Sequence, residues 1–222
     1  MYWKEPQEKP VEASERMVDV LFTISCRVLP LDHAHALSQA ILGALPWLEG
    51  EEGGIHLIHG AESGNGWYRP ETPDALLYPS RRTRMSLRLP KGRVEDAKAL
   101  SGKTLDIGGH ALTVGKPSVK PLKPSGTLFS RYVVDLGKDE DTFLEDVARE
   151  IEAMGISVNK LLCGKPHLLR FPEGALSTRS LMVADLRPED SVRLQEKGLG
   201  TWQKQGCGLL VAYKDIKPVK TD

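Results

Sequence analysis

The stretch PEDSVRLQEKGLGTWQKQGCGLLV, residues 188–211, combines a helix, a glycine-bracketed loop and the start of a closing strand. A helix is predicted over Pro188–Lys197, because proline opens the segment and Gly198 follows it. A dinucleotide-binding loop would need a glycine in place of Gln203, and a Walker loop would need Gly-Lys-Ser/Thr, so both are excluded. A closing strand is expected over Gly208–Lys214.

Four glycines bracket this loop symmetrically: Gly198, Gly200, Gly206 and Gly208. Glycines let a backbone approach a ligand closely and present its amides to phosphate, and Lys204 adds a cation. The alternative is a helix C-cap glycine followed by a bulge, which explains only one or two of the four.

The segments before this stretch alternate between strand and helix patterns. Strands are predicted over Thr127–Leu136, Lys160–Cys163 and Leu176–Leu186, with Leu168–Phe171 as a further candidate. The apolar stripe within Asp139–Met154 predicts a helix.

The N-terminal part shows the same order. Strands are predicted over Val18–Leu29, Ile55–His59 and Arg84–Leu89, and strand material continues through Val114. Helices are predicted over Asp32–Leu45, with Asp32 as N-cap, and over Lys91–Leu100.

A βαββαβ order seen twice predicts an α+β protein with tandem ferredoxin-like (RRM-like) domains. We expect a polar leader over residues 1–16, disordered in the free chain, and a first domain over residues 17–119. The linker is expected over residues 120–126, where Pro, Gly and Ser cluster, and the second domain, with the glycine-rich loop, over residues 127–222.

Composition restricts the class of protein. The 222 residues are 40% hydrophobic and 27% charged, which is typical of a soluble globular chain and excludes a fibrous one. No window resembles a membrane helix or a signal peptide. The widely spaced Cys26, Cys163 and Cys207 favour neither a disulfide framework nor a cysteine zinc site, so we expect a reducing, cytoplasmic setting.

Charge is segregated although 30 basic residues balance 30 acidic ones. Residues 80–131 contain twelve Lys and Arg against three acids, whereas residues 132–156 contain eight acids against two bases. The pattern indicates a surface that faces a polyanion; basic residues that merely line a solvated surface explain it equally well.

The spacing G-h-G-x5-G-h-G (h, apolar) before a C-terminal strand resembles the loop of the CRISPR-associated RAMP superfamily, in particular its repeat-processing ribonucleases, the Cas6 family. TRSLMVADL (residues 178–186), continuing through SVRLQEK (residues 191–197), and LPLDH (residues 29–33) resemble the Myxan subtype of that family. The resemblance spans about residues 17–214 and implies tandem ferredoxin-like domains.

The resemblance also implies a function. We expect metal-independent cleavage of CRISPR repeat RNA, in which a ribose 2′-OH attacks the adjacent phosphate and leaves a 5′-OH and a 2′,3′-cyclic phosphate or 3′-phosphate. Such a reaction needs positioning, an acid or base and cationic stabilisation, but no metal or cofactor. The implied partners are the repeat RNA and its hairpin and, as an open question, other Cas proteins of a type I effector complex; no membrane is implied.

In the family a histidine near the start of the first helix is commonly the acid/base residue, and His33 matches that position. At 100° per residue, His33 lies about 70° and His35 about 130° from the centre of the apolar stripe, so His33 is the first choice and His35 the second. A helix N-terminus disfavours imidazolium, which suits a base better than an acid. A structural His33, or catalysis located elsewhere or lost, remains an alternative.

RNA recognition is expected from phosphate contacts and base stacking. The candidate residues are Arg81, Arg82, Arg84, Lys160, Arg179, Gly198, Gly200, Trp202, Lys204, Gly206 and Gly208. Trp202 could equally be a core residue, and each charge alone could be solvated surface. His56 and His59 diverge along a strand and lack a third ligand, so no zinc site is expected.

Three functions stay open at this level. The first is a repeat endoribonuclease; the second is a non-catalytic RAMP subunit that binds RNA within an effector complex. The third is a tandem ferredoxin-like module for a small metabolite, which the basic segment disfavours.

Overall fold

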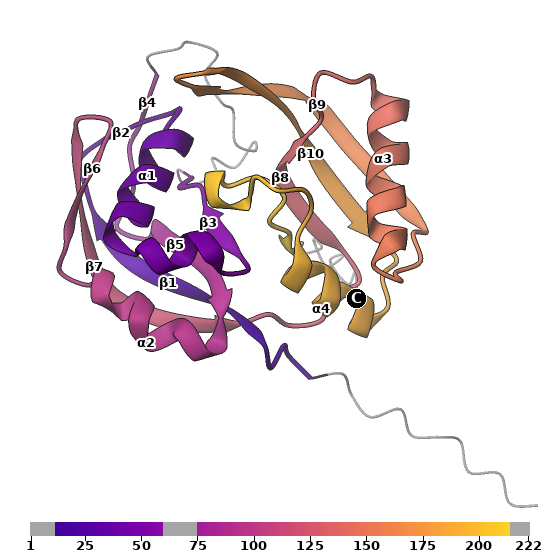
Figure 1. Ribbon diagram of the computed structural model, residues 1–222, viewed down its shortest axis with the longest axis horizontal. Coiled ribbons are helices and arrows are strands. Elements are labelled where there is room, and N and C mark those ends of the chain that lie inside the picture. Colours follow the sequence, from indigo (N-terminus) through magenta and orange to yellow (C-terminus); the bar gives the residue numbers. More distant parts are fainter. Residues whose placement is uncertain (1–11, 60–74, 214–222) are drawn as a thin grey trace, which may run out of the picture.

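The computed structural model describes residues 12–59 and 75–213 (Figure 1). Its N-terminal half contains a five-stranded antiparallel sheet in the order β3-β5-β1-β7-β6. These strands are β1 (Met17–Ser25), β3 (Gly54–His56), β5 (Arg84–Pro90), β6 (Thr104–Ile107) and β7 (His110–Pro121). A separate pair joins β2 (Leu29–Pro30) to β4 (Leu76–Leu77).

Helices cover the N-terminal sheet through an apolar stripe. Helix α1 (Ala34–Ala44) buries Leu37 and Ile41, and the 3₁₀ turn Pro46–Gly50 buries Leu48. The segment 91–100 is helical in three short pieces, with α2 (Val94–Ala97) between 3₁₀ turns Lys91–Arg93 and Lys98–Leu100. These apolar side chains and those of the sheet form one core.

The C-terminal half contains a four-stranded sheet in the order β11-β8-β10-β9. Its strands are β8 (Leu128–Val134), β9 (Lys160–Phe171), β10 (Gly174–Ala184) and β11 (Val211–Ala212). Helices α3 (Glu140–Ala153) and α4 (Pro188–Lys197) pack on one face, where Phe143, Val147 and Leu194 meet the sheet. The 3₁₀ turn Gln203–Gln205 lies in the glycine-rich loop.

The two sheets share one strand order. When the four principal strands of each half are numbered along the chain, both sheets read 4-1-3-2, and every pairing is antiparallel. This is the order of the βαββαβ ferredoxin-like unit. The predicted α+β class with two such units is confirmed, and β6 is an added edge strand.

The halves are joined by a shared core rather than by a linker alone. Strand β7 ends at Pro121 and so includes the first two residues of the predicted linker, whereas β8 begins at Leu128, after it. Tyr132, Leu169 and Cys207 from the C-terminal half are buried in the N-terminal core. The long hairpin β9–β10 reaches over α1, as Figure 1 shows. Separation of the two halves would therefore expose apolar surface on both of them.

Several predicted bounds differ from the observed ones for local reasons. Asp32 does not cap α1, because His33 occupies the N-cap position, directly before Ala34. The strands predicted over 160–163 and 168–171 are one continuous β9, and the closing strand is only two residues long. Residues 1–11 of the predicted leader and Lys214 lie outside the described residues.

Candidate functional site

The glycine-rich loop, residues 198–208, lies between the two halves, where it meets β3 and α1. The amides of its four glycines donate hydrogen bonds within the protein, at 2.7–3.2 Å. The acceptors are the carbonyl oxygens of Leu194, Gln203 and Tyr132 and, for Gly200, the carboxylate of Glu150. These amides are therefore engaged within the protein, and phosphate binding by the loop stays a prediction.

The glycines serve close packing instead. A Cβ on Gly208, whose φ is +71°, would lie 1.7 Å from the carbonyl oxygen of Leu199. A Cβ on Gly206 would lie 2.5 Å from the side chain of Leu57 on the N-terminal half. The loop thus folds back on itself and presses against the first half, which only residues without a side chain permit.

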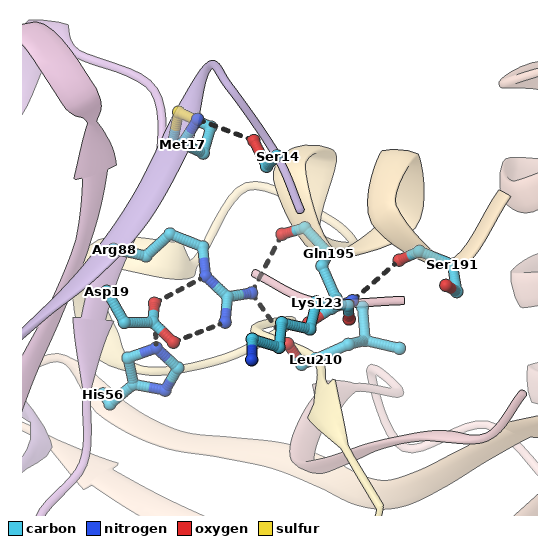
Figure 2. A network of polar contacts seen from close by, with 9 residues as sticks. All are labelled: Ser14, Met17, Asp19, His56, Arg88, Lys123, Ser191, Gln195 and Leu210. Carbon is cyan, nitrogen blue, oxygen red and sulfur yellow. Dashed lines mark hydrogen bonds and ion pairs between the residues drawn. The ribbon is translucent and has the colours of Figure 1, made fainter. Parts of the chain in front are cut away.

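A buried ion pair holds both ends of the loop to the N-terminal sheet (Figure 2). Arg88 on β5 and Asp19 on β1 are direct cross-strand partners, with Nε and Oδ1 2.8 Å apart and both side chains buried. Nη1 of Arg88 also donates to the carbonyl oxygens of Gln195 and Leu210, at 2.8 and 2.7 Å. These two carbonyls lie just before and just after the loop, so one guanidinium fixes its entry and its exit.

The pKa of Asp19 follows from the same network. Burial acts to raise it, but the charges of Arg88 and His56, whose Nε2 lies 3.4 Å from Oδ1, together outweigh burial and hold the pKa far below its usual range. Asp19 is therefore ionised at neutral pH, and it balances the Arg88 charge.

Lys204 anchors the middle of the loop. Its ammonium donates to the carbonyl oxygens of Glu51 and Gly53, each 2.8 Å away. Both residues directly precede β3 in the chain. Burial lowers the pKa of Lys204, and the nearby Glu51 partly opposes this. The residue predicted to bind phosphate thus joins the two halves.

His33 is buried and held by backbone groups in this fold. It is 3% exposed; Nδ1 lies 2.9 and 3.1 Å from the carbonyl oxygens of Pro30 and Leu31, and Nε2 accepts the Ile58 amide at 3.0 Å. The proton therefore sits on Nδ1, and both ring nitrogens are engaged with the backbone. The backbone before α1 thus folds around the ring, and a catalytic role of His33 stays a prediction.

His35 lies at the meeting point of three elements. Its half-buried ring is edge-on to Phe171 at the end of β9, with ring centroids 6.1 Å apart. Phe171 in turn contacts Trp202 of the glycine loop, at 5.5 Å. Asp32 and Arg170 form an ion pair at 3.6 Å beside these rings. The structure thus brings the start of α1, the hairpin and the loop together at a partly exposed aromatic cluster, and His35 is directed toward Phe171 rather than freely into solvent.

The remaining predicted RNA-binding residues are dispersed. Arg81 and Arg82 are exposed at the turn before β5, and Arg84 donates to the carbonyls of Arg81 and Thr83, each at 2.9 Å. Lys160 is exposed on β9, at the far end of that strand from Phe171.

Arg179 is committed to the protein interior. Its Nε lies 3.0 Å from the buried Asp135 carboxylate, and its other nitrogens donate to the carbonyls of Gly164 and Lys138. Trp202, by contrast, is 37% exposed and is not a core residue.

Sequence reasoning missed the Asp19–Arg88 pair and Phe171. The available signal was a charged residue inside each of two otherwise apolar strands, since Asp19 and Arg88 both interrupt runs of buried residues. Within residues 12–59 and 75–213, no group of three or more His, Cys, Asp or Glu could hold a metal ion. Among the same residues, no helix is long and apolar enough to span a membrane.

Comparisons with known proteins agree with this arrangement. The sequence model of the family described as "Cas6 Crispr" matches residues 18–215. A CRISPR-associated endonuclease Cas6 from Myxococcus xanthus (strain DK1622) is 33% identical over 196 residues, which are 87% of this chain and 80% of the relative. The chain belongs to the Cas6 family. The predicted family and its class, CRISPR-associated endonuclease, are confirmed.

Solved structures of the Cas6 family share the fold at low sequence identity. A CRISPR associated protein Cas6 superposes with a TM-score of 0.60 at 14% identity, covering 89% of this chain and 100% of that one. A Cas6-related protein from Pyrococcus furiosus gives 0.59 at 15% identity, covering 90% and 99%. These likenesses support the tandem ferredoxin-like architecture of this Cas6 chain.

Proposed function

We propose that the chain cleaves CRISPR repeat RNA without a metal, by attack of a ribose 2′-OH on the adjacent phosphate. The 33% identical relative is named as an endonuclease of this family, which supports RNA strand cleavage as the reaction. In this chemistry the substrate supplies the nucleophile, so the protein needs only to align the reacting atoms and to move protons.

His35 is the catalytic residue in this proposal. The observation that carries it is the cluster in which His35 meets Phe171 and, through it, Trp202 of the glycine loop. His33, the first choice from sequence, uses both ring nitrogens to hold its own backbone. Of the two histidines, His35 is the one whose ring lies at the junction of both halves.

The imidazole of His35 would act on the 2′-OH or on the leaving 5′-oxygen. As a base it takes the proton from the 2′-OH; as an acid it gives one to the departing 5′-oxygen, which becomes a 5′-OH. The products are a 2′,3′-cyclic phosphate, opened in some cases to a 3′-phosphate, and a 5′-OH end. One positioned acid or base contributes roughly 10²–10⁴-fold in rate.

The chain's setting is part of the proposal. Cys26, Cys163 and Cys207 are free thiols, which suits a reducing compartment, and we place the protein in the cytoplasm. The repeat RNA hairpin is the proposed partner, and other Cas proteins of an effector complex are the candidates for its protein partners.

The test is single-turnover cleavage of the cognate repeat RNA in EDTA. Cleavage should persist without metal, a 2′-deoxy nucleotide at the cut site should block it, and His35→Ala should slow it by about 10²-fold or more. His110→Ala, which removes a histidine from β7, is the matched control and should cleave at the normal rate. An absolute magnesium requirement, or normal cleavage by His35→Ala, contradicts the proposal.

A second function has its own support. Both ring nitrogens of His33, the first choice for the catalytic residue, contact backbone groups, which fits a RAMP subunit that binds RNA but does not cut it. Tight binding of the repeat hairpin with no product after prolonged single-turnover incubation would favour this function over the first.

A further inference from the structure

One face of the C-terminal sheet carries a row of apolar side chains that no helix within residues 12–59 and 75–213 covers. Phe129 on β8 is the direct partner of Met182 on β10, which is the direct partner of Leu162 on β9. Val211 on β11 continues the row on the other side of Phe129. Direct partners in an antiparallel sheet point to the same side, so these four residues share one face.

The opposite face is closed by helices. The neighbouring row, Leu128, Val183 and Leu161, points the other way and packs in the core beneath α3 and α4. Alternation along the strands therefore places the Phe129 row on the face opposite α3 and α4. Leu162 is 52% exposed there.

An aromatic pair and two cations border this row. The ring of Tyr213, which is 42% exposed and follows β11, lies 6.0 Å from the ring of Phe129. The guanidinium of Arg131 lies 6.0 Å from the Phe129 ring centroid, at the limit of a cation–π contact. Lys160, two residues before Leu162 on β9, is exposed on the same face.

We propose that this face is a stacking platform for unpaired nucleotides of an RNA strand. The platform consists of Phe129, Tyr213, Met182 and Leu162, flanked by Arg131 and Lys160. Aromatic rings on a sheet stack on nucleobases, and they do so with any sequence because every base has a π-face. Adjacent cations neutralise the phosphates of the strand. A protein partner would meet the same apolar row, but the two cations beside it favour a polyanion.

The platform lies next to the candidate cleavage site along β8. Tyr132, three residues after Phe129, accepts the amide of Gly208 in the glycine loop. A strand held on the platform would therefore lead toward the junction at which His35 lies. The inference rests on the proposed function only in taking RNA as the ligand, since no platform residue takes part in the chemistry.

The test measures binding of a fluorescein-labelled ten-nucleotide oligoadenylate by fluorescence anisotropy. Tyr213→Ala should weaken binding by roughly 5- to 100-fold, the effect of losing about one stacked base, whereas Tyr213→Phe should keep the affinity within about twofold. Phe129→Ala and Leu162→Ala should weaken binding in the same direction. Tyr78→Ala is the matched control, because Tyr78 is 71% exposed on the other half of the chain.

Stacking has a direct optical signature. A 2-aminopurine in place of a central adenine should lose fluorescence on binding, and Tyr213→Ala should restore it at saturating protein. No binding of oligoadenylate by the wild-type chain, or wild-type affinity in folded Tyr213→Ala and Phe129→Ala, overturns the proposal and leaves the face to a protein partner. Cleavage is assayed separately: His35→Ala should bind oligoadenylate normally, so failure of the ribonuclease proposal would not remove the platform.

Discussion

Arg88, in the sheet of the N-terminal half, donates from Nη1 to the carbonyl oxygen of Leu210, 2.7 Å away in the C-terminal half. The same nitrogen also reaches Gln195, so the glycine loop is fixed at both ends to a residue whose charge is balanced by Asp19. Guanidinium suits this task because its planar fork serves a carboxylate and two carbonyls at once. The network links the fold of one half to the position of a loop in the other.

Arg88→Met should destabilise the protein strongly. It leaves the buried Asp19 carboxylate without its partner, and breaking a buried pair in this way costs about 3–5 kcal/mol. Arg88→Lys should recover only part of this, because an ammonium cannot make the bidentate contact. Chemical denaturation with a two-state fit measures the difference.

The control for Arg88 is Arg149→Met on α3. Arg149 is 72% exposed and pairs with Asp146, so its loss should change the unfolding free energy by less than about 1 kcal/mol. Equal effects of the two substitutions would contradict the role of Arg88 as an interior anchor.

Acid should weaken the native state through Asp19. Its pKa in the folded protein lies below the unfolded value of 3.8, so its ionised form stabilises the fold above about pH 4, and this stability is lost as the pH falls further. Asp19→Asn lacks this titration. The difference in unfolding free energy between wild type and Asp19→Asn should therefore be constant near neutral pH and shrink below about pH 4. Chemical denaturation at a series of pH values measures this difference. A constant gap down to pH 3 would contradict the assignment.

Periodicity was sufficient to predict the elements whose packing is decided within one half. Helix α3 lies within the predicted range Asp139–Met154 and buries Phe143, Val147 and Ile151, and Asp139 caps it through the Thr142 amide. The two βαββαβ orders are confirmed because the strand and helix patterns repeat in both halves. The family resemblance, which rested on motifs, is confirmed by the family model and the 33% identical relative.

The site was harder to predict because it depends on contacts between the halves. The polar and apolar residues of Arg84–Leu89 alternate, as in a strand with one exposed face, yet Arg88 is 1% exposed, since the second half covers the polar side of β5. A helical wheel placed His33 about 70° from the centre of the apolar stripe, but it carries no information on the backbone before the helix, whose carbonyls hold the ring. Strand pattern also gave no sign that Phe171 would meet α1.

The glycines of the loop should differ in their tolerance of a side chain. Gly200→Ala should cost only about 1–2 kcal/mol, the strain of a left-handed residue, because its Cβ would meet no atom within 4 Å. Gly208→Ala should cost about 3 kcal/mol or more, because its Cβ would collide with the backbone of Leu199. Both glycines have a positive φ, so both variants carry the backbone strain, and the difference in stability between them in thermal unfolding measures the collision alone. Equal losses of stability in the two variants would contradict the close packing around Gly208.

Lys204 should not behave as a phosphate contact. Its ammonium is held by the carbonyls of Glu51 and Gly53, so Lys204→Met should lower stability but leave the salt dependence of RNA affinity unchanged. Lys160→Met, which removes an exposed cation, should instead reduce the slope of log affinity against log salt by about 0.7–0.9. A reduced slope for Lys204→Met would return that residue to the RNA-binding set.

Cys207 should report the opening of the loop. Burial raises the pKa of its thiol to about 12, and it is 1% exposed, so the thiolate that reacts with disulfide reagents is scarce and shielded in the native state. At pH 8 we expect the half-buried Cys26 and Cys163 to be modified first, and Cys207 only as the loop separates from the N-terminal core. Arg88→Met should speed modification of Cys207 more than that of Cys26, because the anchor at both loop ends is gone, and peptide mass spectrometry can follow each thiol. Modification of Cys207 as fast as Cys26 in the wild-type chain would mean that the loop is not held in the core at all.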